Sequence, residues 1–398
     1  MIFFMSFIYG TPPPPVDSTY TNKSAYKDTT NKKYYKFSGW NKSGEFNISS
    51  NTSIRGSWDN GNSIDEFSIV TKTGEEQYGK VVYGDCNGGV FVTIISTYAG
   101  GVDGSTTCIY SKDGTTWNTT TVSSSKHYWM DIAYGDGYFV MIAKDGYCSY
   151  STNGINWTDY YHTYIDNSTC ICYGDKNKLF AVLGSGTMLS YCLSSDLSSK
   201  SWNGGSLAGM PTITDMCYGE GIYLAVCNTV NQYYQSNDGI SWYANTITMS
   251  SGSTSTAYDG CSYLKDYNTG VSRFIFYSTS TTGYLVSTAI TASLTWKPVS
   301  ASVRFIDACN TTTNPKLIMI LSGKNVFRIG DVTISSSGDI TYTSTPVLYN
   351  GGVNYSSFTN VAYGNGIIVI TGAIDDNNKD NRYLFAVSSA YPDLNYVD

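Results

Sequence analysis

Few side chains in this sequence have the type and spacing that enzymatic chemistry requires. The 398 residues include only two histidines, His127 and His162, and neither lies beside a Ser or Cys nucleophile motif. Two histidines are too few for a His-rich metal site. Glu is scarce, and the more numerous Asp residues do not single out a pair of catalytic carboxylates. We therefore predict no catalytic, metal-binding or cofactor-binding residue, and we expect the histidines to pack on the surface or between repeats.

One set of acidic residues recurs at a fixed place, directly after a Tyr-Gly pair. It comprises Asp85, Asp136, Asp175 and Glu220, with Asn365 at the same place near the C-terminus. In a ring of repeats these side chains would project from one face near the axis, where their oxygens would suit Ca²⁺ or another hard cation. Asp and Asn are also the residues that tight turns prefer. We favour the turn interpretation and leave the cation interpretation open.

The Tyr-Gly pairs mark the start of a cassette that recurs along the chain from about residue 80. The clearest copy covers residues 132–158, and parts of it return at 217–243 and 361–372. Each copy reads as four strands, because Gly-Asp-Gly and similar turns supply the positive φ of hairpins and apolar runs follow them. Seven starts are visible, at Tyr83, Tyr134, Tyr173, Tyr218 and Tyr363, with degenerate copies at Tyr258 and near Asp307.

The spacing of this cassette predicts the architecture. Its Trp recurs at intervals near the roughly 40 to 50 residues that are typical of a propeller blade. A ring of blades also lets a chain of this length avoid the usual size limit of a single core. The sequence therefore predicts an all-β fold, a seven-bladed β-propeller with an extended N-terminal arm, and six or eight blades remain alternatives.

Within three cassettes a Ser-x-Asp-Gly-x-x-Trp pattern recurs, with Asn in place of Asp once. Its residues are Ser111, Asp113 and Trp117, then Ser151, Asn153 and Trp157, then Ser236, Asp238 and Trp242. On these motifs the chain, from about residue 80 to 398, resembles the Asp-box (BNR, sialidase-like) β-propeller proteins of the kind found in tailed-bacteriophage virions and tails. The resemblance implies that the nine residues stabilise turns between outer strands. The Asp or Asn would accept backbone N–H bonds while the Trp packs beneath.

The resemblance does not extend to sialidase activity, which needs three arginines around the substrate carboxylate. The chain has five arginines, and Phe327-Arg328-Ile329-Gly330 is the one segment that is faintly similar to the sialidase Phe-Arg-Ile-Pro motif. That segment lies in the sixth cassette and lacks the Pro, so we attribute the similarity to chance.

Composition excludes several other classes of function. The net charge of −7 and the pI near 4.9 argue against nucleic-acid binding. No apolar stretch reaches the roughly 18 residues of a membrane helix, so no membrane span is expected. The ten cysteines recur at equivalent repeat positions, which should lie too far apart for disulfides. We expect free thiols that pack as small core residues, as in a protein folded in a reducing cytoplasm.

The N-terminal region has its own organisation. We predict an anchoring arm over residues 1–40 and a propeller over 41–398, which closes when an N-terminal strand pairs with the last blade, because the final cassette ends before its fourth strand. The arm begins with an apolar run and continues through Pro12–Pro15 into a polar stretch. Residues 1–15 are expected to contact a neighbouring subunit or another virion protein. The contact residues of the apolar run are Ile2, Phe3, Phe4, Met5, Phe7, Ile8 and Tyr9.

These features predict a non-enzymatic structural or attachment component of a virion, a head-fibre, decoration or tail protein assembled in the host cytoplasm. The alternative is a carbohydrate-binding adhesin that recognises host surface glycans, and less favoured is a glycan hydrolase. The phage context follows from the resemblance and the arm, because the repeat alone would suit many extracellular proteins.

Overall fold

The computed structural model describes most of the repeat region and seven short strands outside it. The described residues are 76–97, 104–250, 256–278, 283–290, 294–299, 303–311, 316–321, 327–335, 339–347 and 355–374, with strands at 24–28, 33–40, 56–58, 62–63, 67–71, 383–388 and 395–397. Residues 1–23, which include the predicted contact residues of the arm, lie outside the described residues.

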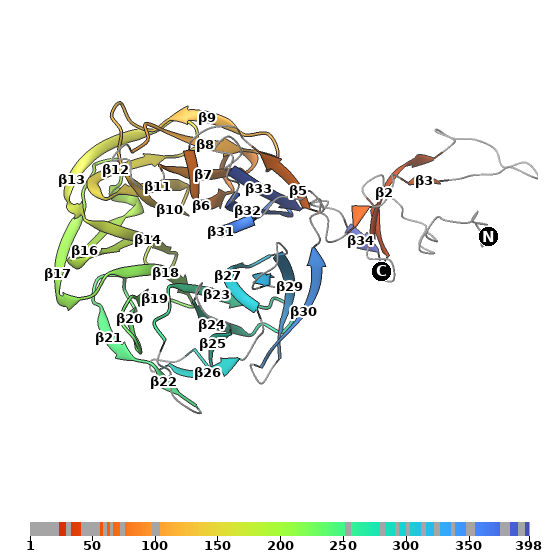
Figure 1. Ribbon diagram of the computed structural model, residues 1–398. Helices are drawn as coiled ribbons and strands as arrows, with labels where there is room; N and C mark the ends of the chain where they lie inside the picture. The colour runs from red at the N-terminus through yellow and green to blue at the C-terminus, as the bar shows by residue number, and fades with distance from the viewer. Residues whose placement is uncertain are drawn as a thin grey trace, which may run out of the picture. The chain divides into compact units, whose positions relative to one another are not determined.

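Most of the described strands form antiparallel four-stranded sheets in which neighbours in sequence are neighbours in the sheet. Six such sheets and one five-stranded sheet, here called blades 1 to 7 in chain order, surround a common centre (Figure 1). The first three blades are β6–β9, β10–β13 and β14–β17. Their strands are β6 Glu76–Gly84, β7 Val90–Thr97, β8 Thr107–Ser111, β9 Asn118–Thr121, β10 Trp129–Gly135, β11 Tyr138–Ala143, β12 Asp145–Ser151, β13 Thr158–Asp166, β14 Ser168–Gly174, β15 Leu179–Gly184, β16 Gly186–Leu193 and β17 Asn203–Met210.

Blades 4 to 6 continue the same order, and blade 5 carries one additional strand. The short strand β22 pairs in parallel with β26, the outermost strand of that blade. The strands are β18 Ile213–Gly219, β19 Ile222–Cys227, β20 Gln232–Ser236, β21 Tyr243–Thr246, β22 Thr248–Met249, β23 Gly260–Lys265, β24 Ser272–Tyr277, β25 Tyr284–Ser287, β26 Thr295–Val299, β27 Val303–Cys309, β28 Lys316–Leu321, β29 Phe327–Ile334 and β30 Ile340–Val347. Two 3-10 turns, η1 Cys86–Gly88 and η2 Ser194–Asp196, complete the regular elements of blades 1 and 3.

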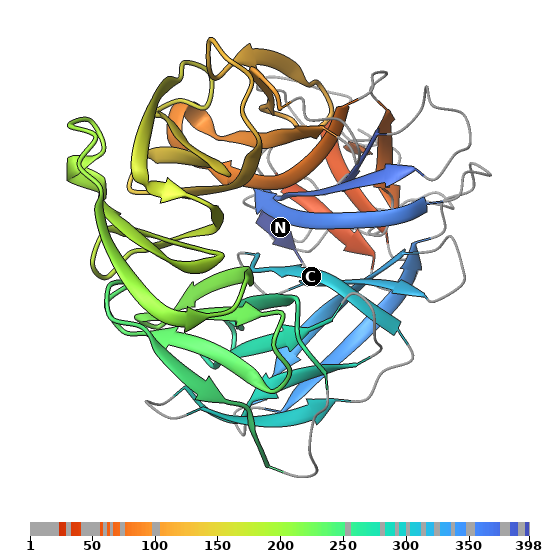
Figure 2. The same cartoon turned by 60° about the vertical axis from the view of Figure 1, so that its left-hand side comes forward.

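Blade 7 contains strands from both ends of the chain. Its order is β31 Tyr355–Gly364, β32 Ile367–Ile374, β33 Tyr383–Ser388 and β5 Phe67–Thr71. The N-terminal strand β5 therefore supplies the fourth strand that the last cassette lacks, at the place where the sequence predicted a closing strand. Figure 2 shows the blades around the centre of the ring from a second direction. The all-β prediction and the propeller architecture are confirmed.

The remaining strands form a separate small sheet. Its order is β3-β2-β1-β34, with β4 also paired to β2. These strands belong to a compact unit distinct from the blades, and β1 pairs in parallel with the C-terminal β34. Their bounds are β1 Ser24–Asp28, β2 Lys33–Trp40, β3 Gly56–Trp58, β4 Asn62–Ser63 and β34 Asn395–Val397.

The structure corrects the predicted domain boundary. Residues 24–28 and 33–40 form an antiparallel hairpin, so the extended arm cannot continue to residue 40. The Tyr- and Phe-containing stretch that we interpreted as a polar tether has the aromatic composition that strands prefer. The ring itself begins with β5 and ends with β33, and not at residues 41 and 398.

The core lies between neighbouring blades. Second strands are almost wholly buried, as in β11, β15 and β19, and the buried side chains of one blade pack on those of the next. All ten cysteines are free thiols, as expected. Most are buried, and burial raises the pKa of the Cys148 thiol to about 12. These thiols pack as apolar side chains.

Candidate functional site

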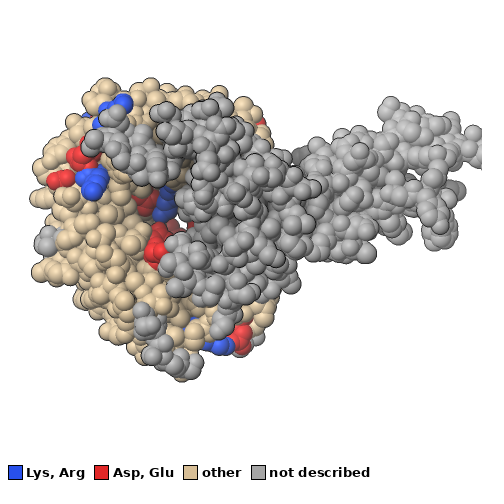
Figure 3. All heavy atoms as spheres, viewed as in Figure 1, with Lys and Arg blue, Asp and Glu red and all other residues tan. Residues whose placement is uncertain are grey.

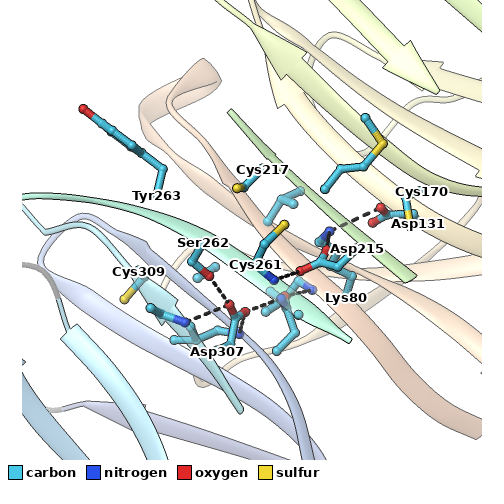
Figure 4. A pocket seen from close by; sticks show the side chains of 18 of the residues that line it. Lys80, Asp131, Cys170, Asp215, Cys217, Cys261, Ser262, Tyr263, Asp307 and Cys309 are labelled. Atoms are coloured by element: carbon cyan, nitrogen blue, oxygen red, sulfur yellow. Dashed lines mark hydrogen bonds and ion pairs between the residues drawn. The ribbon is translucent and has the colours of Figure 1, made fainter. Parts of the chain in front are cut away.

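A cavity of about 570 Å³ occupies the centre of the ring, and all seven innermost strands contribute to its wall. Charged side chains of both signs gather in this hollow (Figure 3). The close view in Figure 4 shows Lys80, Asp131 and Asp215 directed toward one another, with Asp307 further along the wall. The sequence analysis did not predict this cluster. It is the candidate functional site of the described part of the chain.

The charged residues occupy one equivalent position in successive blades, which we call the latch position. In blades 1, 2, 3, 4 and 7 it lies three residues before the Tyr of the Tyr-Gly pair. A change of register in the first strand immediately precedes it in four blades, as between Trp129 and Asp131. Such bulges redirect a side chain. The seven latch residues are Lys80, Asp131, Cys170, Asp215, Gly260, Asp307 and Asn360.

All four acidic or amide latch residues accept a hydrogen bond from the backbone of the next blade. Asp131 accepts from the N–H of Ile171 at 3.0 Å, which joins blade 2 to blade 3. Asp215 accepts from the N–H of Cys261 at 3.0 Å and joins blade 4 to blade 5. The same bond recurs at the closing side of the ring. There Val361 N–H donates to Asp307 at 3.0 Å and Val81 N–H donates to Asn360 at 2.8 Å.

Lys80 supplies the positive charge that this ring of oxygens requires. Its Nζ lies 3.2 Å from a carboxylate oxygen of Asp131 and 3.3 Å from one of Asp215, so blade 1 is linked to blades 2 and 4. Burial alone would lower the pKa of Lys80, but the carboxylates of Asp131 and Asp215 hold it well above the usual value. The ammonium therefore stays charged and bridges the cavity wall.

Asp307 is the most heavily hydrogen-bonded latch residue. Its Oδ1 accepts from the Ser262 hydroxyl at 3.1 Å, the Tyr277 hydroxyl at 3.0 Å and the N–H of Ala308 at 2.7 Å. Its Oδ2 accepts from the amide Nδ2 of Asn360 at 2.5 Å, in addition to the N–H of Val361. One carboxylate thus holds three blades, namely 5, 6 and 7.

Burial and the nearby carboxylate of Asp215 raise the pKa of Asp307 to about 6, although backbone N–H bonds from Val361 and Ala308 oppose the shift. Burial also raises the pKa of Asp131, and the ammonium of Lys80 opposes that shift. At neutral pH Asp307 is therefore ionised, as five donors around one carboxylate require.

A pH dependence of stability follows from the raised pKa. Because the folded pKa of about 6 exceeds the ordinary 3.8, the folded protein binds this proton more tightly than the unfolded chain does. The contribution of Asp307 to the free energy of unfolding is thus largest below pH 4 and falls as the pH rises through 6, by up to ~3 kcal/mol. We expect the stability difference between wild type and Asp307→Asn, measured by urea unfolding, to fall by this amount between pH 4 and 8. A difference that does not change with pH would contradict this assignment.

The Tyr-Gly pairs that mark the repeat form a second set of contacts between blades. A Cβ added to Gly135 would overlap the ring of Tyr173, and one added to Gly219 would overlap the ring of Tyr263. The Gly of one pair thus leaves room for the Tyr of the next blade. In blade 5 this Tyr is Tyr263, and not Tyr258, where the sequence placed the degenerate start. The same arrangement joins Gly364 of blade 7 to Tyr83 of blade 1.

In two blades the acidic residue after the Gly accepts a hydrogen bond from the Tyr of the next blade. Tyr134 donates its hydroxyl hydrogen bond to Asp85 at 2.6 Å, and Tyr263 donates to Glu220 at 2.7 Å. Asp136 instead accepts from Ser194 at 2.6 Å and pairs with Lys178 at 3.1 Å. Among the described side chains, no group of three His, Cys, Asp or Glu is placed to hold a metal ion. The hydrogen bonds and the ion pair of these acids support a role in contacts within and between blades.

The three Ser-x-Asp-Gly-x-x-Trp motifs lie in equivalent hairpins between the third and fourth strands of blades 1, 2 and 4. Asp113 accepts backbone N–H bonds from Thr115 at 2.8 Å and Thr116 at 2.6 Å, and Ser111 donates to it at 3.0 Å. The indole N–H of Trp117 donates to the carbonyl of Gly114 at 2.7 Å. Asn153 with Ser151 and Trp157, and Asp238 with Ser236 and Trp242, repeat this pattern.

The two histidines lie in blade 2. His127 is buried, stacks on Tyr147 with ring centroids 3.7 Å apart, and shares a 2.8 Å hydrogen bond between Nδ1 and Asp145. His162 lies on β13, where its ring packs beside that of Tyr164 at 5.3 Å. Both contacts are packing interactions outside the central cavity.

A sequence signal for the central cluster did exist. The residue three places before the repeated Tyr is Lys80, Asp131, Asp215 or Asn360 in blades 1, 2, 4 and 7. The residue type varies at this position, whereas the acid after the Gly recurs more regularly, so the sequence pattern favoured the acid. At Asp307 the signal is hidden, since Asn310 replaces the Tyr of blade 6.

The fold places the chain among known propellers, although no family model matches it and no curated protein matches its sequence. A solved structure of YCF48 bound to D1 peptide is similar with a TM-score of 0.57 and 13% identity, and covers 83% of this chain and 97% of that chain. YCF48 from Cyanidioschyzon merolae gives 0.55 and 11%, over 80% of this chain and 98% of that one.

An enzyme is also among the similar structures. A catalytically inactive virginiamycin B lyase from Staphylococcus aureus with quinupristin has a TM-score of 0.56 and 10% identity, and covers 81% of this chain and 99% of that chain. At these identities the likeness shows the β-propeller fold alone. In addition, no helix among the described residues is long and apolar enough to cross a membrane.

Proposed function

We propose that this protein is a non-enzymatic structural or attachment component of a virion, docked through its N-terminal residues 1–15. The observation that carries the proposal is the small sheet, a compact unit of its own that the N-terminal strands β1–β4 and the C-terminal strand β34 form together. A closed propeller does not need this unit for its own core. Its place in the sequence, after the apolar run of residues 1–9 and the Pro12–Pro15 stretch, supports a task in attachment.

The contacts in the central cavity are a second observation that supports a non-catalytic role. The carboxylates of Asp131, Asp215 and Asp307 are each committed to backbone N–H groups of a neighbouring blade. A general base must accept a proton from substrate, and such commitments oppose that task. Propellers of this fold do bind polypeptides, as the structure of YCF48 with D1 peptide illustrates, and this is compatible with a protein partner.

Deletion of residues 1–15 tests the proposal. Particles assembled in host cells that produce the truncated protein should lack it, whereas the full-length protein should purify with the particles. The thermal midpoint of the truncated protein should equal that of the full-length protein, because β5 and the blades lie outside the deleted segment. Equal incorporation of the two proteins would overturn the proposal. Release of reducing sugar from a polysaccharide by the purified protein would instead support the hydrolase alternative.

A further inference from the structure

Thiol groups line part of the central cavity, one on the innermost strand of each of blades 3 to 6. They belong to Cys170, Cys217, Cys261 and Cys309. The carboxylate and amide hydrogen bonds that join the blades do not involve these sulfur atoms. The cavity wall therefore carries nucleophilic side chains beyond those that the latch contacts use.

Two of these thiols come from neighbouring blades and contact each other. Cys217 on β18 and Cys261 on β23 pack in one buried cluster, and their thiol groups share a hydrogen bond (Figure 4). The N–H of Cys261 donates to Asp215 at 3.0 Å, and its sulfur lies 3.9 Å from the carbonyl oxygen of Leu224. Leu224 is directly opposite Cys217 in the sheet of blade 4. Three contacts thus place the side chain of Cys261 against that of Cys217.

The pair escapes the distance argument that we applied to cysteines at equivalent repeat positions. Cys217 lies two residues after the latch residue Asp215, whereas Cys261 directly follows the latch residue Gly260. Successive side chains of a strand point to opposite faces, so these two side chains meet between blades 4 and 5. Two thiols in hydrogen-bond contact need to approach by only ~2 Å to reach the length of a disulfide bond.

We propose that Cys217 and Cys261 form a disulfide when hydrogen peroxide enters the central cavity, which cross-links blade 4 to blade 5. One thiol attacks a peroxide oxygen as its thiolate, the O–O bond breaks, and a sulfenic acid forms. The leaving hydroxide takes up the proton of that thiol and becomes water. The second thiol then attacks the sulfenic sulfur, the S–S bond forms, and a second water leaves. In total the two sulfur atoms lose two electrons and one peroxide is reduced to two water molecules.

The cavity supplies the access that most buried thiols lack. Cys217 is 9% exposed and Cys261 is 3% exposed, and both line the cavity. Burial raises the pKa of the Cys261 thiol well above its usual value, so this thiol reacts slowly at neutral pH. A sulfenic acid on either sulfur has the second thiol in contact, and this contact favours the disulfide over further oxidation. The site goes beyond the proposed attachment role and does not depend on residues 1–15.

The test treats the full-length protein with hydrogen peroxide at mildly alkaline pH and then alkylates the remaining thiols after denaturation. Two of the ten cysteines should resist alkylation, and the peptide map should contain the Cys217 peptide linked to the Cys261 peptide. The thermal midpoint of the oxidised protein should rise by about a few degrees, because the cross-link restricts the unfolded chain. Reduction with dithiothreitol should restore both the ten free thiols and the original midpoint.

Substitutions separate this pair from the other cysteines. Cys217→Ala and Cys261→Ala should each abolish the cross-link and the rise of the thermal midpoint. Cys170→Ser is the matched control, because that thiol lies on the same wall in blade 3, where its sulfur contacts the carbonyl of Ile213. This variant should form the Cys217–Cys261 disulfide to the same extent as the wild-type protein.

The peptide map of the wild-type protein decides the proposal even if a variant folds poorly. Alkylation of all ten cysteines after peroxide treatment would overturn it. So would a linked pair other than Cys217 with Cys261, or oxidation of either residue to a sulfinic acid without a disulfide. The protein without residues 1–15 should form the same disulfide, so failure of the attachment role and failure of the thiol site are measured separately.

Discussion

Replacement of Asp307 with alanine should lower the free energy of unfolding at pH 7 by about 3 to 5 kcal/mol. The substitution removes the single acceptor of five hydrogen bonds from blades 5, 6 and 7, and two of these donors are the hydroxyls of Ser262 and Tyr277. Burial of the ionised carboxylate reduces its net contribution to stability. Buried donors that lose their acceptor in the alanine variant destabilise the fold by more. Chemical unfolding with two spectroscopic probes measures the effect.

A matched substitution separates this effect from the loss of a carboxylate in general. Asp136 lies in the exposed turn between the first two strands of blade 2, whereas Asp307 lies on the first strand of blade 6. Asp136 contacts Ser194 and Lys178. Asp136→Ala should cost much less stability than Asp307→Ala, because the contacts that it removes are exposed to solvent. If the two variants lost the same stability, Asp307 would not hold the blades together as described.

Lys80→Met should have the second largest effect, about 3 kcal/mol or more. The substitution keeps a side chain of similar length but leaves Asp131 and Asp215 without their shared cation. The side chain of Asp131 is 4% exposed, so water cannot replace the ammonium. The thermal midpoint should therefore fall, and a second substitution, Asp131→Asn, should recover part of the loss because it removes one uncompensated charge.

The control for this variant is another lysine pair on the ring. Lys178 is 66% exposed and pairs with Asp136 at 3.1 Å, so Lys178→Met should change stability by less than about 1 kcal/mol. A Lys80→Met protein as stable as the Lys178→Met protein would show that the cavity charges are solvated and not structural. Additive effects of Lys80→Met and Asp131→Asn would argue against direct coupling.

Much of the architecture was visible in the sequence because the repeat is regular. The Gly-Asp-Gly turns and the recurring Trp predicted four-stranded blades, and the incomplete last cassette predicted a strand donated from the N-terminal side. The role of the Tyr-Gly pair became clear only in space. Gly135 and Tyr173 are far apart in sequence, yet the ring occupies the volume that a side chain at Gly135 would need.

The central cluster could not be assigned from sequence for a related reason. The partners of a latch residue are backbone amides of the next blade, such as the N–H of Ile171 for Asp131, and backbone groups leave no signature in the sequence. The small sheet was missed because β1 pairs with β34 from the opposite end of the chain. Pairings between distant segments depend on the closed ring, which local patterns do not specify.

The two kinds of contact between blades have a consequence for function. Since the ring uses its inner acids, its tyrosines and its motif turns for stability, we expect binding to use surfaces outside this framework.

Amide hydrogen exchange at Val81, Ile171, Cys261 and Val361 tests the central claim most directly, since these four N–H groups donate to the latch residues. In the wild-type protein all four should be strongly protected. In Asp307→Asn, protection should fall at Val361 by at least about tenfold and remain near wild type at Ile171. Rapid exchange at the four amides in the wild-type protein, or an unchanged Val361 in the variant, would contradict the account.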